Sequence, residues 1–358
     1  MERIGIVGLP NSGKSSLFNA LTGGDAPVAA HPFSTTETSV GIAQVYDHRL
    51  VALAEMSQSQ KVVAATLEFA DQAGLVAGAS TGEGLGNRFL AGIREVDALC
   101  LVLRAFEDEN VVGDTDPMSD FETLELELVL ADATTVANNI DKRRRAAKTD
   151  KSLAHEVVAL ETVEPLLQEG TPLWRADLSD ETRAGLATFS LLTAKRAFAV
   201  VNIGDDQLAQ ADDIVTPIAK AFGDNGEVLA VCVQLEAEAA QMDPAGKSEL
   251  LEGLGLGEGA LPRVTRAAYK LLGRRTFLTT GDKESRAWTF RAGAKAPECA
   301  GVIHSDLQRG FIRAECIAWD ELLALGSWTK AKEAGKLRVE GKDYEVKDGD
   351  TLEIRFNV

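Results

Sequence analysis

The sequence has 358 residues, of which 45% are hydrophobic and 26% are charged, and its formal net charge is −18. This length predicts about two or three domains, and the composition is that of an ordinary soluble globular protein. The strongly negative charge argues against adhesion to nucleic acid or anionic membranes over the whole surface, although it allows a local basic patch. With no secretory signal and no long apolar segment, the sequence predicts a cytoplasmic protein without a membrane partner.

The first motif runs from Gly8 to Ser15, GLPNSGKS, and matches the phosphate-binding pattern G-x-x-x-x-G-K-[ST]. An apolar run at residues 4–7 predicts a buried strand before it, and the spacing at residues 16–21 predicts a helix after it. The glycines let backbone N–H groups turn inward around phosphate oxygens. Lys14 is expected to reach the β- and γ-phosphates, and the Ser15 hydroxyl to ligate Mg²⁺. The residues predicted to bind nucleotide here are Asn11, Ser12, Gly13, Lys14, Ser15 and Ser16.

The segment after the first helix, residues 23–40, is too polar and too interrupted by Gly and Pro for a regular element. In P-loop switch proteins this segment supplies a threonine to Mg²⁺ and the γ-phosphate. Thr35 is the candidate for that metal ligand, and Thr36 is its close rival.

Two strands are expected at residues 40–45 and 62–69, arranged as a hairpin, and the second ends at a D-x-x-G motif. Its aspartate, Asp71, is expected to hold Mg²⁺ or a water bound to the metal. The amide of Gly74 is expected to contact the γ-phosphate, because only a residue without a side chain allows so close an approach.

The residue after this glycine is Leu75, where Ras-like enzymes have a glutamine that orients the attacking water. Hydrolysis is therefore expected to be slow, with Asn11 as a candidate partial substitute that would also help to hold K⁺ beside the phosphates. The predicted catalytic set is Lys14, Asn11 and Gly74. The glycine-rich loop at residues 74–87 is a candidate switch that the γ-phosphate orders.

A further buried strand is expected at residues 96–103, and helical spacing begins at Phe121. The pattern predicts a coiled-coil-like helical hairpin inserted at residues 121–189. Near its turn lies a basic cluster, made of Lys142, Arg143, Arg144, Arg145, Lys148 and Lys151. Contact with ribosomal RNA and an ordinary solvated helix face are both open interpretations of this cluster.

The nucleotide domain resumes at about residue 190, and a strand at residues 197–201 leads to Asn202-Ile203-Gly204-Asp205. GTPases have N-K-x-D at this place, so Asn202, Ile203 and Asp205 are the predicted base-binding residues. Asp205 favours guanine, whereas Ile203 replaces the lysine whose aliphatic stem packs on the base. The sequence therefore leaves the choice between ATP and GTP open.

Short strands around a helix at residues 319–325 predict a small α+β domain of ubiquitin-like size at residues 276–358. The sequence as a whole thus predicts an α/β protein with three parts. A P-loop domain with a mostly parallel sheet covers residues 1–120 and 190–275, the helical insertion covers 121–189, and the small domain ends the chain.

Taken together, these stretches resemble the YchF family of Obg-like ATPases. The matching segments are residues 5–15, 32–35, 71–80, 82–87, 302–306, 310–315 and 340–344. The resemblance covers nearly the whole chain and is weakest at about residues 120–190. It implies a C-terminal TGS domain, Mg²⁺-dependent ATP hydrolysis, and binding to the 70S ribosome and its large subunit in translation or stress response. The family's base motif resembles N-x-x-E, which Ile203 fits and Asp205 does not.

Three functions follow from these observations. The preferred one is a slow, ribosome-associated ATPase that acts as a nucleotide switch. The second is an Obg-type GTPase of ribosome assembly that recognises guanine through Asp205. The third is a ribosome-binding scaffold in which the nucleotide is structural.

Overall fold

The computed structural model describes residues 2–24, 39–72, 85–109, 115–223 and 226–357. The chain separates into two compact units, each made of two stretches of sequence. The first unit comprises Met1–Ala43 and Glu68–Leu271, and the second comprises Gln44–Leu67 and Leu272–Val358.

The first unit is built on a six-stranded sheet with the order β2-β4-β1-β5-β6-β7. The pairings of β1 with β4 and β5, of β5 with β6, and of β6 with β7 are all parallel. This confirms the expected α/β class with a mostly parallel sheet. The strands are β1 (Arg3–Gly8), β2 (Ser39–Val45), β4 (Ala65–Asp71), β5 (Ala98–Arg104), β6 (Arg196–Asn202) and β7 (Val228–Val231).

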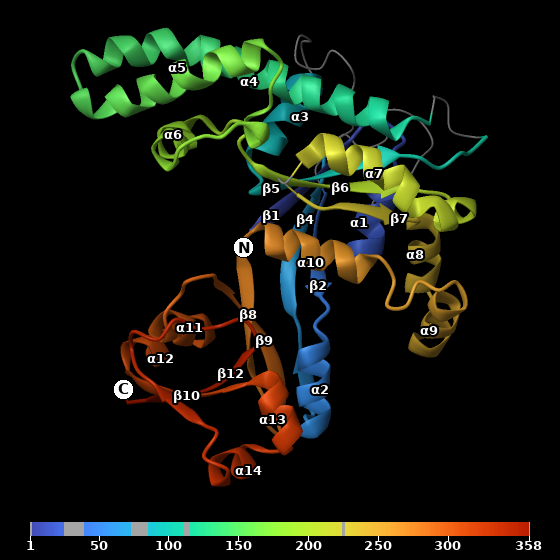
Figure 1. The fold of residues 1–358 in the computed structure, drawn as a ribbon, viewed down its shortest axis with the longest axis vertical. Coiled ribbons are helices and arrows are strands. Elements are labelled where there is room, and N and C mark those ends of the chain that lie inside the picture. Colours follow the sequence, from blue (N-terminus) through green and yellow to red (C-terminus); the bar gives the residue numbers. More distant parts are fainter. Residues whose placement is uncertain (1, 25–38, 73–84, 110–114, 224–225, 358) are drawn as a thin grey trace. The chain divides into compact units, whose positions relative to one another are not determined.

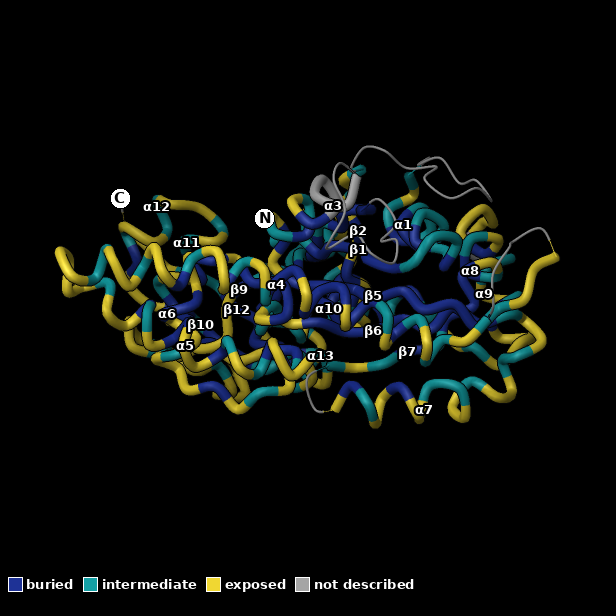
Figure 2. Tube along the Cα trace, turned by 90° about the horizontal axis from the view of Figure 1, so that it is seen from above, coloured by how far each residue is buried: buried dark blue, intermediate teal, exposed yellow. Residues whose placement is uncertain are grey.

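The central strands are apolar because helices cover the sheet on both faces (Figures 1 and 2). All seven residues of β5 are buried. Phe121 and Phe222, from two helices on one face, meet edge to face with their ring centres 5.7 Å apart. The helices of this unit outside the inserted hairpin are α1 (Lys14–Thr22), α3 (Leu85–Arg94), α7 (Ala211–Phe222), α8 (Val233–Ala240), α9 (Pro244–Gly253) and α10 (Leu261–Leu271).

The predicted helical hairpin is present as α4 (Pro117–Ala147) and α5 (Ala154–Gln168), which lie side by side (Figure 1). Asp116 caps α4 by accepting hydrogen bonds from two backbone N–H groups of its first turn. The first half of α4 packs on the sheet through Leu124 and Leu128. Its second half forms a separate core with α5, in which Ile140 and Leu160 are buried. The helix α6 (Asp180–Leu186) completes the insertion.

The second unit contains a six-stranded sheet with the order β11-β10-β12-β8-β9-β3. The helix expected at residues 319–325 is α13 (Trp319–Leu325), and the α+β class of this unit agrees with the prediction. The strands are β3 (Lys61–Val63), β8 (Arg274–Thr279), β9 (Glu284–Arg291), β10 (Phe311–Ala318), β11 (Arg338–Glu340) and β12 (Asp350–Phe356). The other helices are α2 (His48–Met56), α11 (Ala296–Ile303), α12 (Ser305–Arg309) and α14 (Trp328–Glu333).

The second unit also takes in Gln44–Leu67, which the division at residue 276 did not anticipate. The guanidinium of Arg49 on α2 is paired with the carboxylate of Asp348 at 2.8 Å, and the Leu53 carbonyl accepts a hydrogen bond from Thr280. The strand β3 pairs in parallel with β9. The hairpin expected from residues 40–45 and 62–69 is therefore wrong: β2 and β4 are neighbours in the sheet, but α2 and β3 intervene and belong to the second unit.

Candidate functional site

The loop between β1 and α1 is shaped by close packing that leaves no room for side chains at its glycines. A Cβ atom on Gly8 would lie 2.5 Å from the Val102 carbonyl oxygen and 2.6 Å from the Ser12 hydroxyl. Gly13 has a φ of 90°, and a Cβ there would lie 2.2 Å from Nδ2 of Asn202. Asn11 also adopts a left-handed conformation, with a φ of 62°, which asparagine tolerates better than most residues. The tertiary structure thus requires the glycines of the motif.

Lys14 is the first residue of α1, and only 6% of it is exposed. Its ammonium donates a hydrogen bond to the Leu9 carbonyl at 2.8 Å. Burial lowers the pKa of Lys14 to about 8, and the nearby charges of Asp71 and Asp120 offset only part of this effect. A desolvated cation at the start of a helix favours an anion, since the helix N-terminus adds its own positive potential.

Ser15 and Asp71 come together from α1 and the end of β4. The Ser15 hydroxyl donates a hydrogen bond to Oδ2 of Asp71 at 2.6 Å. Asp71 is fully buried, and this burial raises the pKa of its carboxyl group, although the Ser15 hydrogen bond and the Lys14 charge act in the opposite direction. Oδ1 of Asp71 has no hydrogen-bond partner within the described part of the chain. A hydroxyl beside a carboxylate with one free oxygen fits the oxygen ligands that Mg²⁺ prefers.

The prediction of a Mg²⁺ site depends on Ser15 and Asp71, and no larger cluster of metal ligands supports it among the described residues. Among the residues described, no three His, Cys, Asp or Glu side chains are grouped so that they could hold a metal ion. Thr35, the third predicted ligand, and its rival Thr36 lie outside the described residues. Gly74, Leu75 and most of the loop at residues 74–87 lie outside them as well.

Asn202, which the sequence assigned to the base, holds the phosphate loop in place. Its Nδ2 donates to the Ser12 carbonyl at 3.1 Å, and its Oδ1 accepts from the Val233 N–H at 3.2 Å. One buried amide at the end of β6 therefore connects the loop after β1 with the start of α8, at the carboxyl edge of the parallel sheet, where β5 lies between β1 and β6. Ligands of open α/β sheets bind at this edge, so Asn202 is a positioning residue for the phosphate site.

The other two predicted base-binding residues lie in different surroundings. Ile203 is 2% exposed and belongs to the main hydrophobic core, and its N–H donates to the Val231 carbonyl. Asp205 is exposed, and its Oδ1 accepts a hydrogen bond from the N–H of Asp206. The structure therefore does not bring these two side chains to a common surface. Their contacts with a base remain predictions.

One residue of this region, Gln207, was not found from the sequence. Its Oε1 accepts from the Gly204 N–H at 2.8 Å, and its Nε2 donates to the Ala105 carbonyl at 2.9 Å. Gln207 thus fixes the turn after β6 to the end of β5. A glutamine at the third position of a helical turn is the sequence signal for one half of a capping box, and Gly204 has no side chain that could supply the other half.

Ser12 and Ser16 complete the predicted nucleotide-binding set. The Ser12 hydroxyl is buried, and no partner for it occurs among the described residues. Ser16 follows within the first turn of α1 and is half-buried. Together with Oδ1 of Asp71, the Ser12 hydroxyl is a second buried polar atom around the loop that a bound ligand would satisfy.

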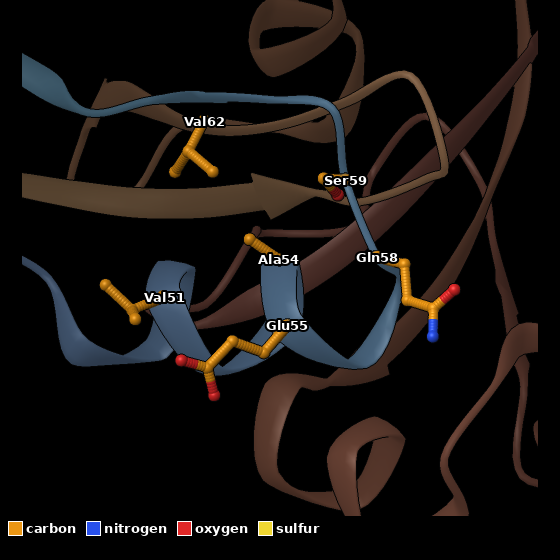
Figure 3. A pocket seen from close by; sticks show the side chains of 6 residues that line it. All are labelled: Val51, Ala54, Glu55, Gln58, Ser59 and Val62. Atoms are coloured by element: carbon orange, nitrogen blue, oxygen red, sulfur yellow. The ribbon is translucent and has the colours of Figure 1, made fainter.

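The second unit has an open pocket of about 460 Å³ against α2 (Figure 3). Ala54 on the helix faces Val62 on the neighbouring strand, whereas the carboxylate of Glu55 points away from both. The Ser59 hydroxyl at its edge already donates to the Gly281 carbonyl at 2.6 Å. The pocket has no buried cation and no helix N-terminus, so it lacks the features of the phosphate loop.

Comparisons with known proteins agree with this geometry over the whole length of the chain. A family model described as "50S ribosome-binding GTPase" matches residues 3–149, and one described as "Protein of unknown function (DUF933)" matches residues 275–357. A Bacillus subtilis protein named "Ribosome-binding ATPase YchF" is 46% identical over 361 residues, which is 99% of each chain. The chain belongs to the YchF family.

Other members of the YchF family support the assignment. A protein of the same name from Escherichia coli O157:H7 is 44% identical, again over 99% of each chain. The solved structure titled "Structure of the Schizosaccharomyces pombe YchF GTPase" superposes with a TM-score of 0.83. It is 31% identical and is matched over 99% of this chain and 97% of that one. The expected family is thereby confirmed, including its P-loop nucleoside triphosphatase domain.

Of the helices that the structure describes, none is both long enough and apolar enough to cross a bilayer.

Proposed function

We propose that this protein is a ribosome-associated ATPase that binds and slowly hydrolyses ATP with Mg²⁺ and works as a nucleotide switch in translation or stress response. The observation that best supports this proposal is the desolvated ammonium of Lys14 at the start of α1, beside the Ser15–Asp71 pair. The relatives from Bacillus subtilis and Escherichia coli are named ribosome-binding ATPases, and these names suggest the substrate and the partner. Association with ribosomes would place the protein in the cytoplasm.

The chain's own residues provide the phosphate site. The loop amides and the Lys14 ammonium would bind the β- and γ-phosphate oxygens, and Lys14 would exchange its bond to the Leu9 carbonyl for one to phosphate. Ser15, Asp71 and Thr35 would hold Mg²⁺. The metal, when bound, neutralises charge that develops on the phosphate oxygens. The amide of Gly74 would contact the γ-phosphate, so that the loop at residues 74–87 responds to its loss.

Slow turnover follows from Leu75, since its aliphatic side chain offers no hydrogen bond to an attacking water. Asn11, held with a positive φ in the phosphate loop, would replace part of this role and would help to hold K⁺ near the phosphates. Turnover that is equal in potassium and sodium buffers would contradict the role of a monovalent cation.

The decisive experiment is equilibrium titration of the purified protein with ATP and with GTP in the presence of magnesium. We expect ATP to bind more tightly, because Ile203 lacks the lysine stem that packs on guanine. A tenfold preference for GTP would overturn the adenine assignment. The same titration on Asp71→Asn should lose its dependence on magnesium while retaining binding of the triphosphate.

A GTPase is the second candidate, because Asp205 keeps the guanine-reading position and the fission yeast relative is titled a GTPase. If guanine is the base, Asp205→Asn should weaken GTP and admit xanthine nucleotide. Unchanged binding in that variant excludes this candidate.

A scaffold that uses nucleotide only as a structural element is the third candidate. Sedimentation with ribosomes, with and without a non-hydrolysable ATP analogue, separates it from the switch. A switch requires different ribosome affinities in the two conditions, whereas a scaffold binds equally in both.

A further inference from the structure

Asp120 is a half-buried carboxylate near the phosphate loop, and the proposed phosphate site does not use it. It lies in the first turn of α4, and its Oδ2 accepts a hydrogen bond from the N–H of Arg104 at 3.0 Å. Arg104 is the last residue of β5, and only 5% of it is exposed. The hydrogen bond therefore fixes Asp120 at the carboxyl edge of the sheet, where the ligands of open α/β sheets bind.

The strand β5 also brings Asp120 close to Lys14. It pairs in parallel with β1, and Val102 is the partner of Gly8 in this pairing. A Cβ atom on Gly8 would lie 2.5 Å from the Val102 carbonyl oxygen and 3.4 Å from Cδ of Lys14, so the lysine side chain runs past this part of β5. Arg104, which holds Asp120, is only two residues further along the same strand.

The charges that act on Asp120 come from three elements. Burial has the largest influence and raises the pKa of the Asp120 carboxyl group, while the N–H and the charge of Arg104 on β5 lower it. The charge of Asp116 on the same helix raises this pKa, and that of Lys14 on α1 lowers it. In the empty protein, the Lys14 ammonium is thus one of the groups that stabilise the charged form of Asp120.

A bound triphosphate would change the surroundings of Asp71 and Asp120 in different ways. Asp71 would gain the positive charge of Mg²⁺. Asp120 would gain no cation, and once Lys14 turns to the phosphates, its carboxylate is left close to their negative charge. Like charges repel more strongly in a partly desolvated site than in water. Asp120 should therefore oppose the ligand that Lys14 attracts.

We propose that Asp120 is a positioning residue that competes with the bound phosphates for the Lys14 ammonium and so weakens nucleotide binding; this rests on the proposed function. The competition acts most strongly on the ligand with the most negative charge, which is ATP rather than ADP. A nucleotide switch has to release its ligand, and a lower affinity favours that release.

The test is titration calorimetry of the full-length protein with ATP and with ADP. The variant Asp120→Asn removes the charge but keeps an oxygen that can accept the hydrogen bond from the Arg104 N–H. We expect it to bind ATP at least about fivefold more tightly than the wild type, and ADP only about twofold. The gain for ATP should be larger in EDTA than in magnesium, because the metal neutralises part of the phosphate charge.

Two control variants separate the charge of Asp120 from other effects. Asp116→Asn removes one negative charge at the exposed start of the same helix, and asparagine is an equally good N-cap. We expect it to bind ATP like the wild type, since water screens an exposed charge. Asp120→Ala removes the hydrogen-bond acceptor as well as the charge. Wild-type affinity in Asp120→Asn together with weaker binding in Asp120→Ala would reduce Asp120 to a structural hydrogen bond and overturn the proposal.

The other outcomes are equally decisive. An equal gain for ATP and ADP, or an equal gain in Asp116→Asn, overturns the proposal. Should denaturant unfolding show that Asp120→Asn does not fold, Asp120→Ser supplies another neutral side chain with an acceptor oxygen for the same titrations. A wild type that binds neither ATP nor GTP refutes the proposed function and this inference together. A wild type that binds ATP while Asp120→Asn gains nothing leaves the proposed function intact and refutes only the role of Asp120.

Discussion

Asp71 in the first unit and Asp350 in the second are both buried, but the protein satisfies their carboxylate oxygens to different extents. Asp71 is fully buried, and Ser15 satisfies only one of its oxygens. Asp350 is 3% exposed and receives hydrogen bonds at both oxygens, from Arg338 at 2.9 Å, from the Tyr344 hydroxyl at 2.7 Å and from the Lys347 N–H at 2.9 Å.

The difference teaches that burial alone does not identify a functional group. A buried carboxylate with all its hydrogen bonds made leaves its partners unpaired when it is removed, whereas a buried oxygen without a hydrogen bond can accept one from a ligand. Around the phosphate loop, the Ser12 hydroxyl and Oδ1 of Asp71 meet this second condition, and beside them the Lys14 ammonium is desolvated by burial. Near Asp350, the neighbouring side chains already supply what a ligand would.

The largest expected effect is on nucleotide binding by Lys14→Ala. We expect ATP affinity to decrease about a thousandfold, since a charge-assisted contact with phosphate inside a desolvated site is lost. The free energy of unfolding of the nucleotide-free protein should stay the same or rise, because a buried cation is removed. Titration calorimetry and denaturant unfolding measure the two quantities, and a normal dissociation constant would contradict the phosphate assignment.

The converse substitution is Asp350→Ala, which should affect stability and leave ATP binding unchanged. Removing the carboxylate leaves the Tyr344 hydroxyl and the Lys347 N–H without their acceptor, and we expect a loss of about 3 kcal/mol in the free energy of unfolding. Denaturant unfolding followed in parallel with ATP titration tests this. A change in the ATP affinity of the folded variant would contradict the expectation that Asp350 affects only stability.

An intermediate effect is expected for Asn202→Ala, which removes the bridge between the Ser12 carbonyl and the Val233 N–H. The unsatisfied groups should cost about 2 kcal/mol of stability, and ATP affinity should also decrease because the loop loses its support. Gln207→Ala is the matched control, since it removes another bridge close by that does not contact the loop. Equal losses of affinity in both variants would argue that Asn202 has no special role in positioning.

The smallest effect is on pH dependence. Burial lowers the pKa of Lys14 to about 8 in the free protein, and a bound polyanion should raise it, so binding takes up a proton above pH 8. ATP affinity should therefore decrease about tenfold between pH 7 and pH 9. Calorimetry at pH 8.5 in two buffers of different ionisation enthalpy should show uptake of roughly three-quarters of a proton. Uptake near zero would mean that Lys14 does not neutralise the bound phosphates.

The sequence by itself determined the parts whose signal is local. The GLPNSGKS motif, the apolar strand before it and the helix after it predicted the phosphate loop, because a strand, a turn and a helix start are specified by adjacent residues. The apolar strands predicted the parallel sheet, and the long helical spacing from Phe121 predicted the hairpin. The position of Asp71 at a strand end followed from the same reasoning.

Only the tertiary structure decided which distant residues meet. Asn202 lies 190 positions from Ser12, and the parallel sheet brings them together because the carboxyl ends of its strands share one edge. The placement of Gln44–Leu67 in the second unit depends on partners such as Asp348 and Thr280, more than 200 positions away. The ion pair between Arg144 on α4 and Glu161 on α5 likewise depends on how these two helices pack against each other. Such contacts are set by packing and by charges brought close in space, and no local pattern encodes them.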